Sequence, residues 1–155
     1  MRIGLISDTH GMLRPEVFTH FEGVERILHA GDIGSVDLLV ELEAIAPVLA
    51  VWGNTDGFDV RARVPEKVKT ELEGRRIIVV HGHRLGSPNP ERLRAAYPDA
   101  DVVVFGHTHQ AVVDREGGVL VVNPGAAGPA RFRLTPSVAI LTLEGETADV
   151  QIIPL

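Results

Sequence analysis

Five short polar segments of the sequence each follow an apolar stretch and carry side chains that can bind a metal ion. These segments are Asp8-Thr9-His10, Gly31-Asp32, Gly53-Asn54, His81-Gly82-His83 and Gly106-His107-Thr108-His109. Cysteine is absent from the chain, so a metal ion must be held by oxygen and nitrogen atoms. Carboxylate, amide and imidazole groups together suit Mn, Fe or Zn better than Mg²⁺ or Ca²⁺, which prefer oxygen alone. The segments therefore predict a transition-metal site.

The number of candidate ligands favours two metal ions over one. Seven side chains are too many for a single tetrahedral ion, but they suit two ions of higher coordination that share a carboxylate. The seven are Asp8, His10, Asp32, Asn54, His81, His107 and His109. Two such ions can hold a bridging hydroxide and clamp a phosphoryl group during in-line displacement. Such a centre could therefore support a displacement reaction at phosphorus.

The first part of the chain has the pattern of parallel strands joined by helices. Apolar runs predict strands at Arg2 to Ser7, Arg26 to Ala30 and Val48 to Val51. A helix is expected from Pro15 to Phe21, and Ser35 can cap a second helix that ends before Pro47. Apolar residues recur at helical spacing in this second helix: Leu38, Leu39, Leu42 and Ile45. A β-α-β-α-β series implies parallel strands covered by helices.

The candidate ligands are expected to meet at one edge of this sheet. The carboxyl ends of parallel strands share an edge, so residues just beyond them converge. Residues two apart in extended chain point the same way, which would pair Asp8 with His10 and His107 with His109. The glycines beside them allow sharp turns and close approach of the backbone.

The remainder of the chain is richer in strands. Phe58 to Glu66 shows no clear period and is expected to be a loop. A hairpin around Gly74-Arg75, a helix and further strands follow, at Val68 to Glu73, Arg76 to Val80, Pro90 to Tyr97 (the helix), Asp101 to Phe105, Ala111 to Arg115, Val119 to Val122, Val138 to Leu143 and Ala148 to Ile153. The last third is interpreted as a β-meander that includes the Gly117-Gly118 turn. The prediction is an α/β protein of two packed sheets with helices outside, forming a single domain over 1–155.

Composition narrows the classes of partner. The net charge of −6 and the pI near 5.6 argue against binding a long nucleic acid, which needs a basic surface. A small phosphate ester remains compatible, because bound divalent metals reverse the local charge. No apolar run is long enough for a membrane span, and Asp8 interrupts the early apolar run that a signal peptide would need. The expectation is a cytoplasmic protein, and the β-rich C-terminal half is compatible with a homodimer without requiring one.

The five segments, in this order, resemble the motifs of the calcineurin-like metallophosphoesterase superfamily. The similarity runs from the first residue to about residue 131, and Asn123-Pro124-Gly125 near the end resembles the small bacterial and archaeal phosphodiesterase branch. The resemblance implies a four-layer α/β/β/α sandwich of two mixed sheets flanked by helices. This fold agrees with the strand pattern above.

The resemblance also implies roles for the candidate ligands. One metal would be held by Asp8, His10, Asp32 and His109, and the other by Asp32, Asn54, His81 and His107. Asp32 would bridge the two ions, and Asp32, Asn54 and His81 would be the catalytic residues. The nucleophile would be a metal-bridging hydroxide, so no covalent intermediate is expected. The cofactors implied are two divalent transition metals, with Mn favoured over Fe, Ni, Co or Zn.

Thr55 departs from a common pattern of the superfamily. Many members carry a histidine directly after the metal-binding asparagine, where it protonates the leaving group, and Thr55 stands there in this chain. The small phosphodiesterase branch commonly lacks this histidine too. Without a positioned acid, which is typically worth ~10²–10⁴-fold, esters with poor leaving groups should be cleaved slowly. The favoured function is therefore a phosphodiesterase acting on a small ester with a capable leaving group.

Several polar residues near the motifs have both a functional and a structural interpretation. Thr55, His83 and Arg131 are candidate substrate contacts, and His83 could also replace the missing acid. Asp56 and Asp59 could shape specificity or lie in a solvated loop. His29 is expected to be a hydrogen-bonded structural residue, His20 a surface residue, and Asn123 to Pro129 mostly a tight connection.

Two other functions remain open. A phosphomonoesterase of the same fold is disfavoured by Thr55 and by the short chain, which has no room for inserted lids. The superfamily also includes a retromer scaffold subunit that uses the fold to bind proteins. That role would be expected where the ligands have decayed, and here all seven positions are intact.

Overall fold

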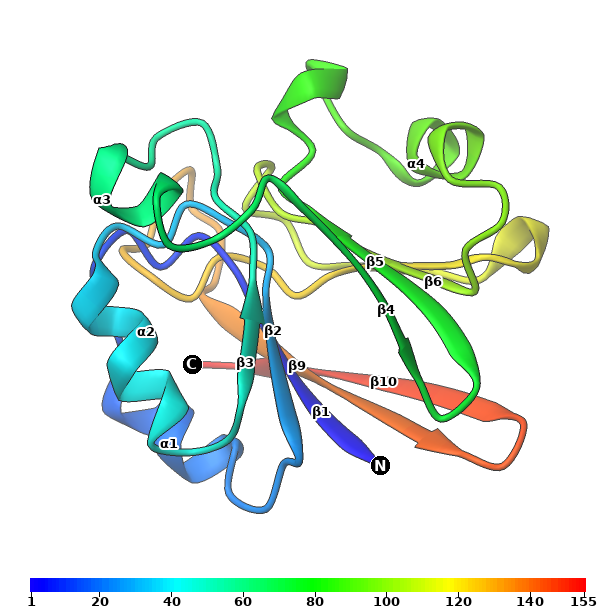
Figure 1. Ribbon diagram of the computed structural model, residues 1–155, viewed down its shortest axis with the longest axis horizontal. Coiled ribbons are helices and arrows are strands. Elements are labelled where there is room, and N and C mark those ends of the chain that lie inside the picture. The colour runs from blue at the N-terminus through cyan, green and yellow to red at the C-terminus, as the bar shows by residue number, and fades with distance from the viewer.

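The strands form two mixed sheets of five strands each in the computed structural model, which describes residues 1–155. The first sheet has the order β10 (Thr147–Pro154), β9 (Ser137–Glu144), β1 (Arg2–Ile6), β2 (Arg26–His29), β3 (Val48–Ala50). The second has the order β4 (Lys67–Leu72), β5 (Arg75–Val80), β6 (Val102–Val104), β8 (Leu120–Asn123), β7 (Val112–Asp114). In the first sheet β1, β2 and β3 are parallel to one another, and β9 and β10 are added in antiparallel pairs on the β1 side (Figure 1). In the second sheet β5, β6 and β8 are parallel, and the two edge strands β4 and β7 are antiparallel to their neighbours.

Helices cover the outer faces of both sheets. They are α1 (Pro15–His20), α2 (Val36–Glu43), α3 (Phe58–Arg61) and α4 (Pro90–Ala96). Pro15 occupies the first position of α1, where its missing N–H removes no hydrogen bond. Ser35 caps α2, because its hydroxyl oxygen accepts a hydrogen bond from the Leu38 N–H at 3.3 Å. The caps expected from the sequence are thus in place.

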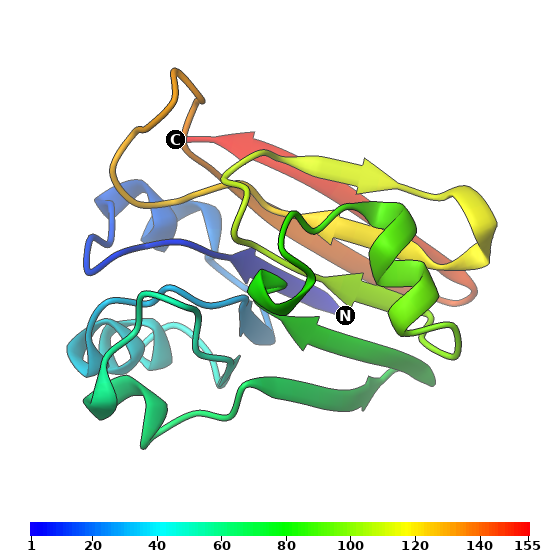
Figure 2. The same ribbon diagram turned by 90° about the horizontal axis from the view of Figure 1, so that it is seen from above.

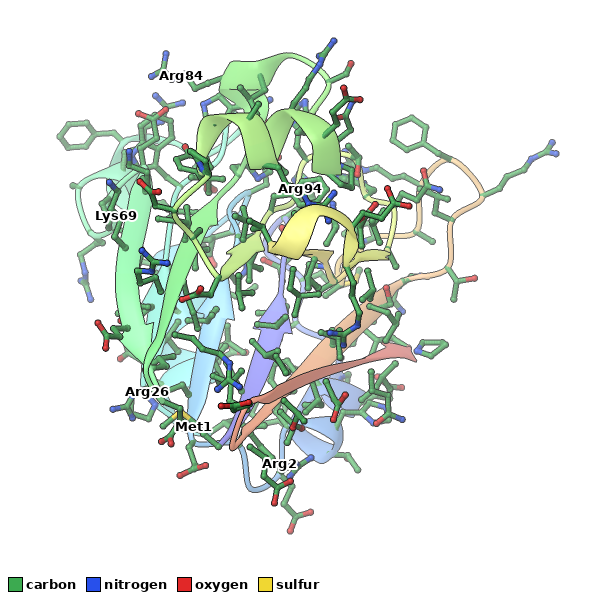
Figure 3. All side chains as sticks on the ribbon, turned by 90° about the vertical axis from the view of Figure 1, so that its right-hand side faces the viewer. Met1, Arg2, Arg26, Lys69, Arg84 and Arg94 are labelled. Carbon is green, nitrogen blue, oxygen red and sulfur yellow. The ribbon has the colours of Figure 1, made fainter.

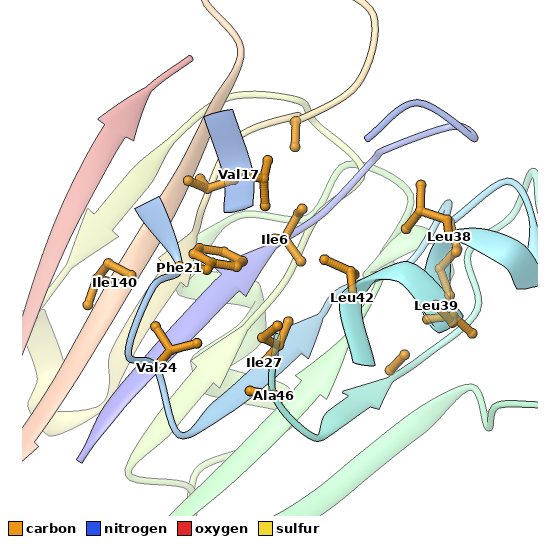
Figure 4. Close-up of a cluster of buried hydrophobic side chains, with 14 of the residues drawn as sticks. Ile6, Val17, Phe21, Val24, Ile27, Leu38, Leu39, Leu42, Ala46 and Ile140 are labelled. Atoms are coloured by element: carbon orange, nitrogen blue, oxygen red, sulfur yellow. The ribbon is translucent and has the colours of Figure 1, made fainter. Parts of the chain in front are cut away.

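Three apolar clusters mark the four layers. The first joins α1 and α2 to the outer face of the first sheet, and Figure 4 shows Phe21 and Leu42 directed toward Ile6 and Ile27. The second lies between the two sheets, with Leu5 and Val79 among its members, and the third packs α4 on the second sheet. Figure 2 shows this layering from above. The α/β/β/α sandwich of two mixed sheets flanked by helices is confirmed.

Three details of the predicted elements are wrong. Residues 58–66 were expected to be a loop, but Phe58–Arg61 forms the single turn of α3 after Gly57. The hairpin between β4 and β5 turns at Glu73 and Gly74, one residue earlier than predicted, because both residues adopt positive φ in a two-residue turn. The last third is no simple meander: β8 pairs in parallel with β6, and the chain then returns to the first sheet as β9 and β10.

The topology brings five strand ends to one end of the molecule. The parallel strands of both sheets end in the upper half of the view in Figure 1, where the connecting loops gather. Figure 3 shows Arg84 at one end of the molecule and Met1 and Arg2 at the opposite end, where β1 begins. No helix combines the length and apolar character needed to cross a membrane.

Candidate metal centre

The backbone at the strand ends is left-handed instead of extended. Five of the eight non-glycine residues with positive φ are candidate ligands: Asp8, His10, Asp32, His107 and His109. The extended-chain reason given for the pairing of ligands two residues apart is therefore wrong. The pairs still meet, since the chain coils at each strand end. Left-handed backbone in non-glycine residues is uncommon and concentrates at functional sites.

One carboxylate oxygen of Asp8 is held by hydrogen bonds, and the other lies among the imidazoles of the candidate ligands. Its Oδ2 accepts hydrogen bonds from the Ser7 hydroxyl at 2.6 Å and from the His107 N–H at 3.2 Å. Its Oδ1 is buried and has no hydrogen-bond partner. This atom lies 3.3 Å from His109 Nε2 and 3.9 Å from both His10 Nε2 and His81 Nε2. A buried carboxylate oxygen left without a donor is the environment that a cation satisfies.

Asp32 is arranged in the same way. Its Oδ1 accepts a hydrogen bond from the Thr55 N–H at 3.0 Å. Its Oδ2 lies 3.8 Å from His10 Nε2 and 3.3 Å from His81 Nε2. Burial opposes ionisation, but the His81 ring in its protonated form and the Thr55 N–H, which both donate hydrogen bonds to the carboxylate, outweigh it and hold the pKa of Asp32 below its ordinary value. The carboxylate is therefore charged and presents one free oxygen between two imidazoles.

His81 has its ring orientation fixed by the backbone. Its Nδ1–H donates to the Ala30 carbonyl at 2.8 Å, so the neutral ring keeps the lone pair on Nε2. Nε2 faces Asp32 Oδ2 and also lies 3.0 Å from Asn54 Oδ1, another oxygen. Burial lowers the pKa of His81, but Asp32 and Asp8 raise it by more, so the net shift is upward. A proton and a metal ion compete for this nitrogen.

The remaining candidate ligands complete two overlapping groups. Asn54 Oδ1 lies 3.2 Å from His107 Nδ1, and His10 Nε2 lies 3.5 Å from His109 Nε2. Burial lowers the pKa of His10 and of His107, which favours the neutral imidazoles that bind metals. Converging ligand atoms define two sets, Asp8-His10-His109 and Asp8-Asp32-His81. The donor atoms and the unpartnered Asp8 oxygen fit a divalent transition metal in each set.

The two sets place Asp8 where the family resemblance placed Asp32, as the shared residue. Asp32 Oδ2 is nearer to His81 Nε2 than Asp8 Oδ1 is, at 3.3 Å against 3.9 Å. Toward His10 the two carboxylates are equally near, at 3.8 and 3.9 Å. Asp8 is the closer partner of His109 only. Both carboxylates therefore lie within 3.9 Å of imidazoles from both sets.

Asp56 is a site residue that sequence reasoning did not resolve. Its carboxylate is buried and accepts hydrogen bonds from the N–H groups of Ile33 at 3.1 Å, Gly34 at 2.9 Å and Gly53 at 2.9 Å. These donors lie on the loops that carry Asp32 and Asn54. Asp56 therefore ties two ligand-bearing loops together, and the solvated-loop interpretation is wrong for it. The only sequence signal was its position two residues after Asn54.

Close backbone approach explains two of the glycines beside the ligands. A Cβ on Gly53 would lie 2.2 Å from Asp32 Oδ1, and one on Gly106 would lie 2.1 Å from Ser7 Oγ and 2.7 Å from Asp8 Oδ2. Both contacts are too short to exist. The glycines are therefore required so that the carboxylates can reach their donors.

We expect Gly53→Ala to weaken metal binding by roughly 10–100-fold, the range found when the surroundings of a ligand are disturbed. The added methyl group must displace the Asp32 carboxylate that Thr55 now orients. The matched control is Gly57→Ala, because a Cβ there meets nothing within 4 Å and φ is negative. Calorimetric titration with Mn²⁺ measures both. Equal affinities of the two variants would contradict the role assigned to Gly53.

His29 is a buried structural histidine, as expected from the sequence. Its Nδ1 accepts the Gly31 N–H at 3.2 Å, so its Nε2–H donates to the Thr9 hydroxyl at 3.0 Å. That hydroxyl in turn donates to the Ile33 carbonyl at 2.8 Å. Complete burial lowers the pKa of His29 to about 4. The ring is neutral and holds the backbone that leads into Asp32.

The depressed pKa of His29 predicts a loss of stability in acid. The unfolded chain takes up the proton near pH 6.5, whereas the folded chain resists it until about pH 4. Stability is therefore complete above pH 6.5 and falls as the pH drops toward 4, by about 3 kcal/mol for this group. Urea unfolding of the metal-free protein at several pH values measures the slope. His29→Gln keeps a donor and an acceptor and should flatten that slope; an unchanged slope would contradict the assignment.

Two of the three candidate substrate contacts, Thr55 and His83, touch residues of the candidate metal centre. Thr55 is exposed, and its N–H orients Asp32. The ring of His83 packs between those of Trp52 and His81, each with its centroid 5.6 Å away, and His83 Nε2 lies 3.6 Å from Glu66 Oε1. Burial lowers the pKa of His83. His83 thus packs beside His81, and the chain between the two residues is not extended, because Gly82 adopts positive φ.

Trp52 packs against His83, and Arg61 packs on Trp52. Neither residue was predicted as part of the site from the sequence. The guanidinium of Arg61 lies 4.2 Å from the ring centroid of Trp52. Arg61 also donates hydrogen bonds to the carbonyls of Asp56 at 2.8 Å and Asn54 at 3.4 Å. It therefore supports the loop that carries Asn54. No motif marks either residue, and only the fold brings them together.

Asn123 to Pro129 is mainly structural, as favoured from the sequence. The Asn123 amide donates to the Gly106 carbonyl at 3.2 Å and to Thr108 Oγ1 at 3.1 Å, which secures the loop before His107. The Gly128 N–H donates to the Asp8 carbonyl at 3.2 Å. Arg131, at the end of this connection, is exposed and its charge contributes to lowering the pKa of His10.

Comparisons with known proteins agree with this fold and site. A family model described as the calcineurin-like phosphoesterase superfamily domain matches residues 1–146. A probable metallophosphoesterase of Methanothermobacter thermautotrophicus is 42% identical over 161 aligned positions, covering 99% of this chain and 92% of that protein. A phosphodiesterase of Methanocaldococcus jannaschii is 31% identical, over 81% of this chain and 83% of that protein.

Solved structures show the same architecture. The structure of an archaeal phosphodiesterase has a TM-score of 0.81 at 29% identity, with 100% of both chains covered. Vps29 of Entamoeba histolytica, in complex with zinc, has a TM-score of 0.80 at 22% identity, with 99% of both chains covered. At that identity the likeness to Vps29 shows the fold alone.

The extent of the family match and the sequence identities define the class of this protein. The chain belongs to the calcineurin-like phosphoesterase superfamily. It is a metal-dependent phosphoric ester hydrolase, and its homologues are small archaeal and bacterial metallophosphoesterases and phosphodiesterases.

Proposed function

We propose that this chain is a phosphodiesterase that works with two divalent metal ions bridged by Asp32. The observation that carries the proposal is the position of Asp32 Oδ2, 3.8 Å from His10 Nε2 and 3.3 Å from His81 Nε2. Its other oxygen is occupied by the Thr55 N–H, so a single carboxylate oxygen is directed between the two groups of ligands. That arrangement suits Asp32 as a ligand that both ions would share.

The chain would hold each ion with side chains from several strand ends. Asp8, His10, Asp32 and His109 would bind one, and Asp32, Asn54, His81 and His107 the other. Mn²⁺ suits this mixture of oxygen and nitrogen, as do Fe, Ni, Co and Zn. When bound, the two cations would supply Lewis acidity toward the phosphoryl oxygens and lower the pKa of an attacking water.

Residues of the chain would fix the charge and the orientation of the groups that bind the ions. Asp32 stays ionised through its hydrogen bonds, so it contributes negative charge without binding a proton from the substrate. The Ala30 carbonyl keeps the Nε2 lone pair of His81 directed at the cluster. Thr55 supplies no acidic group to the leaving oxygen, which favours diesters whose leaving group departs without protonation.

The preference for diesters is tested with matched aryl esters. Protein loaded with Mn²⁺ should hydrolyse bis(4-nitrophenyl) phosphate faster than 4-nitrophenyl phosphate. Both esters release 4-nitrophenol, so the difference in rate reports the preference for diester over monoester. A strong preference for the monoester would overturn the assignment to diesters. Absence of turnover on either ester with each of Mn²⁺, Fe²⁺, Ni²⁺, Co²⁺ and Zn²⁺ would overturn hydrolysis at this site.

Thr55→His is expected to restore the missing acid in part. Thr55 is exposed and follows Asn54, so an imidazole at this position can reach a leaving oxygen. Hydrolysis of an alkyl diester should rise by roughly tenfold or more, below the full range for a well-placed acid, while an activated aryl diester should change little. The ratio of kcat/KM values for the two diesters is the measurement. Equal effects on both would show that the residue at this position does not act as an acid.

A further inference from the structure

Residues 131–134 form a strained turn at the rim of the metal centre. The Leu134 N–H donates to the Arg131 carbonyl at 2.9 Å, and the two residues between them, Phe132 and Arg133, have φ values of 56° and 59°. Two successive left-handed residues are the pattern of a turn that ordinarily takes asparagine or glycine. Positive φ in a bulky aromatic residue is an outlier, and backbone outliers of this kind concentrate at functional sites.

The turn is anchored to the strand end that carries Asp8. The Ala127 N–H donates to the Ser7 carbonyl at 2.9 Å, and the Gly128 N–H donates to the Asp8 carbonyl. The Arg14 side chain binds the carbonyls of Ala127 at 3.2 Å and Gly128 at 3.0 Å. These contacts fix the start of the segment relative to the metal ligands.

The side chain of Phe132 stands in solvent directly beside a candidate ligand. Its ring centroid lies 5.9 Å from that of His109 in an edge-to-face arrangement, and 78% of the residue is exposed. No other part of the chain covers the ring. Arg131, the preceding residue, is exposed and places positive charge at the same rim. An uncovered aromatic face and a guanidinium therefore adjoin the place where a phosphate would bind.

We infer that Phe132 is a specificity residue that stacks against a planar ring carried by one substituent of the phosphate ester. The substrate class is then a phosphate diester with a nucleobase or other aromatic group on one arm. This inference rests on the proposed function for its placement of the phosphate. Stacking of a base on an aromatic side chain tolerates many ring structures, so the contact selects planar rings as a class and not one base.

Binding to the Mn²⁺-loaded protein tests the inference without requiring turnover. The probes are thymidine 5′-monophosphate and methyl phosphate, which share the phosphate and differ in the ring, and calorimetry gives both dissociation constants. Phe132→Ala should weaken the thymidine nucleotide by roughly tenfold and change methyl phosphate by less than about twofold. Phe132→Trp should retain the preference. Phe18→Ala, which removes a half-exposed ring from α1, is the control and should change neither.

Three outcomes would overturn the role of Phe132. Equal weakening of both probes, or no change in either, would show that the ring does not contact the substituent. A Phe132→Ala variant that differs from the wild type in oligomeric mass and keeps the preference for the nucleotide would assign the ring to an interface between copies of the chain. Arg133→Gly removes one strained side chain and keeps Phe132, so it should keep the nucleotide preference.

Failure of the proposed function gives a different result. Thymidine 5′-(4-nitrophenyl) phosphate and methyl 4-nitrophenyl phosphate release the same alcohol. If neither is hydrolysed but Phe132→Ala still weakens the nucleotide selectively, the phosphodiesterase assignment is wrong and the stacking role stands. If both are hydrolysed with the same kcat/KM in wild type and Phe132→Ala, and binding is unaffected, the stacking role is wrong and the phosphodiesterase assignment stands.

Discussion

Asp32→Ala is expected to lower hydrolysis of bis(4-nitrophenyl) phosphate by roughly 10³-fold or more, equivalent to at least about 4 kcal/mol of transition-state stabilisation. The reason is geometric, because Asp32 Oδ2 lies close to imidazoles of both ligand sets, 3.8 Å from His10 Nε2 and 3.3 Å from His81 Nε2. Removing it leaves Asp8 as the one carboxylate near both His10 and His81, and it reduces the negative charge that would hold the two cations. The measurement is kcat/KM of the Mn²⁺-loaded variant.

The control for this substitution is a carboxylate removed from the site. Asp149→Ala deletes an exposed acidic side chain on β10 and should leave kcat/KM within about twofold of the wild type. Urea unfolding of the metal-free Asp32→Ala protein shows whether it is folded, which separates loss of the site from loss of the fold. Turnover that survives Asp32→Ala in folded protein would contradict the bridging role.

Asp56→Ala is expected to destabilise the protein by about 3–5 kcal/mol. The substitution leaves the N–H groups of Ile33, Gly34 and Gly53 without their acceptor, and Ile33 and Gly53 are buried. The loops that carry Asp32 and Asn54 then lose their common anchor, so metal affinity should fall as well. Urea unfolding of the metal-free protein measures stability, and titration with Mn²⁺ measures affinity.

Two variants refine the test of Asp56. Asp56→Asn keeps an oxygen for two of the donors but turns an NH₂ group toward the third, so its stability should fall between those of the wild type and Asp56→Ala. Asp59→Ala removes a neighbouring exposed carboxylate on α3 and should change stability by less than about 0.5 kcal/mol. If Asp56→Ala is as stable as Asp59→Ala, the carboxylate does not anchor the loops.

The fold was predictable because its signals are local and periodic. Pro15 and Ser35 mark helix starts, and the run Ile3 to Ile6 has the uninterrupted apolar character of a strand buried on both faces. The short α3 escaped prediction, since four residues give no helical period. The parallel pairing of β8 with β6 also escaped, because nothing in a strand's own sequence states which neighbour it will pair with.

The seven candidate ligands were predictable from their order along the chain, but the way in which they meet was not. Coiling of the backbone at His10 and His107 depends on close contacts with other strand ends, as at Gly34, where a Cβ would collide with Gly11. The anchoring role of Asp56 likewise depends on three donors from two distant segments. Phe132 could not be assigned a place, because its nearness to His109 arises only from the folded turn.

The number of metal ions bound per chain tests the central claim most directly. Protein reconstituted with Mn²⁺, freed of excess metal and analysed by inductively coupled plasma mass spectrometry should contain roughly two ions per chain, as a dinuclear phosphoesterase requires. Asp32→Ala should contain fewer. A wild-type content of one ion or none, under conditions that support hydrolysis, would contradict a dinuclear centre built on Asp32.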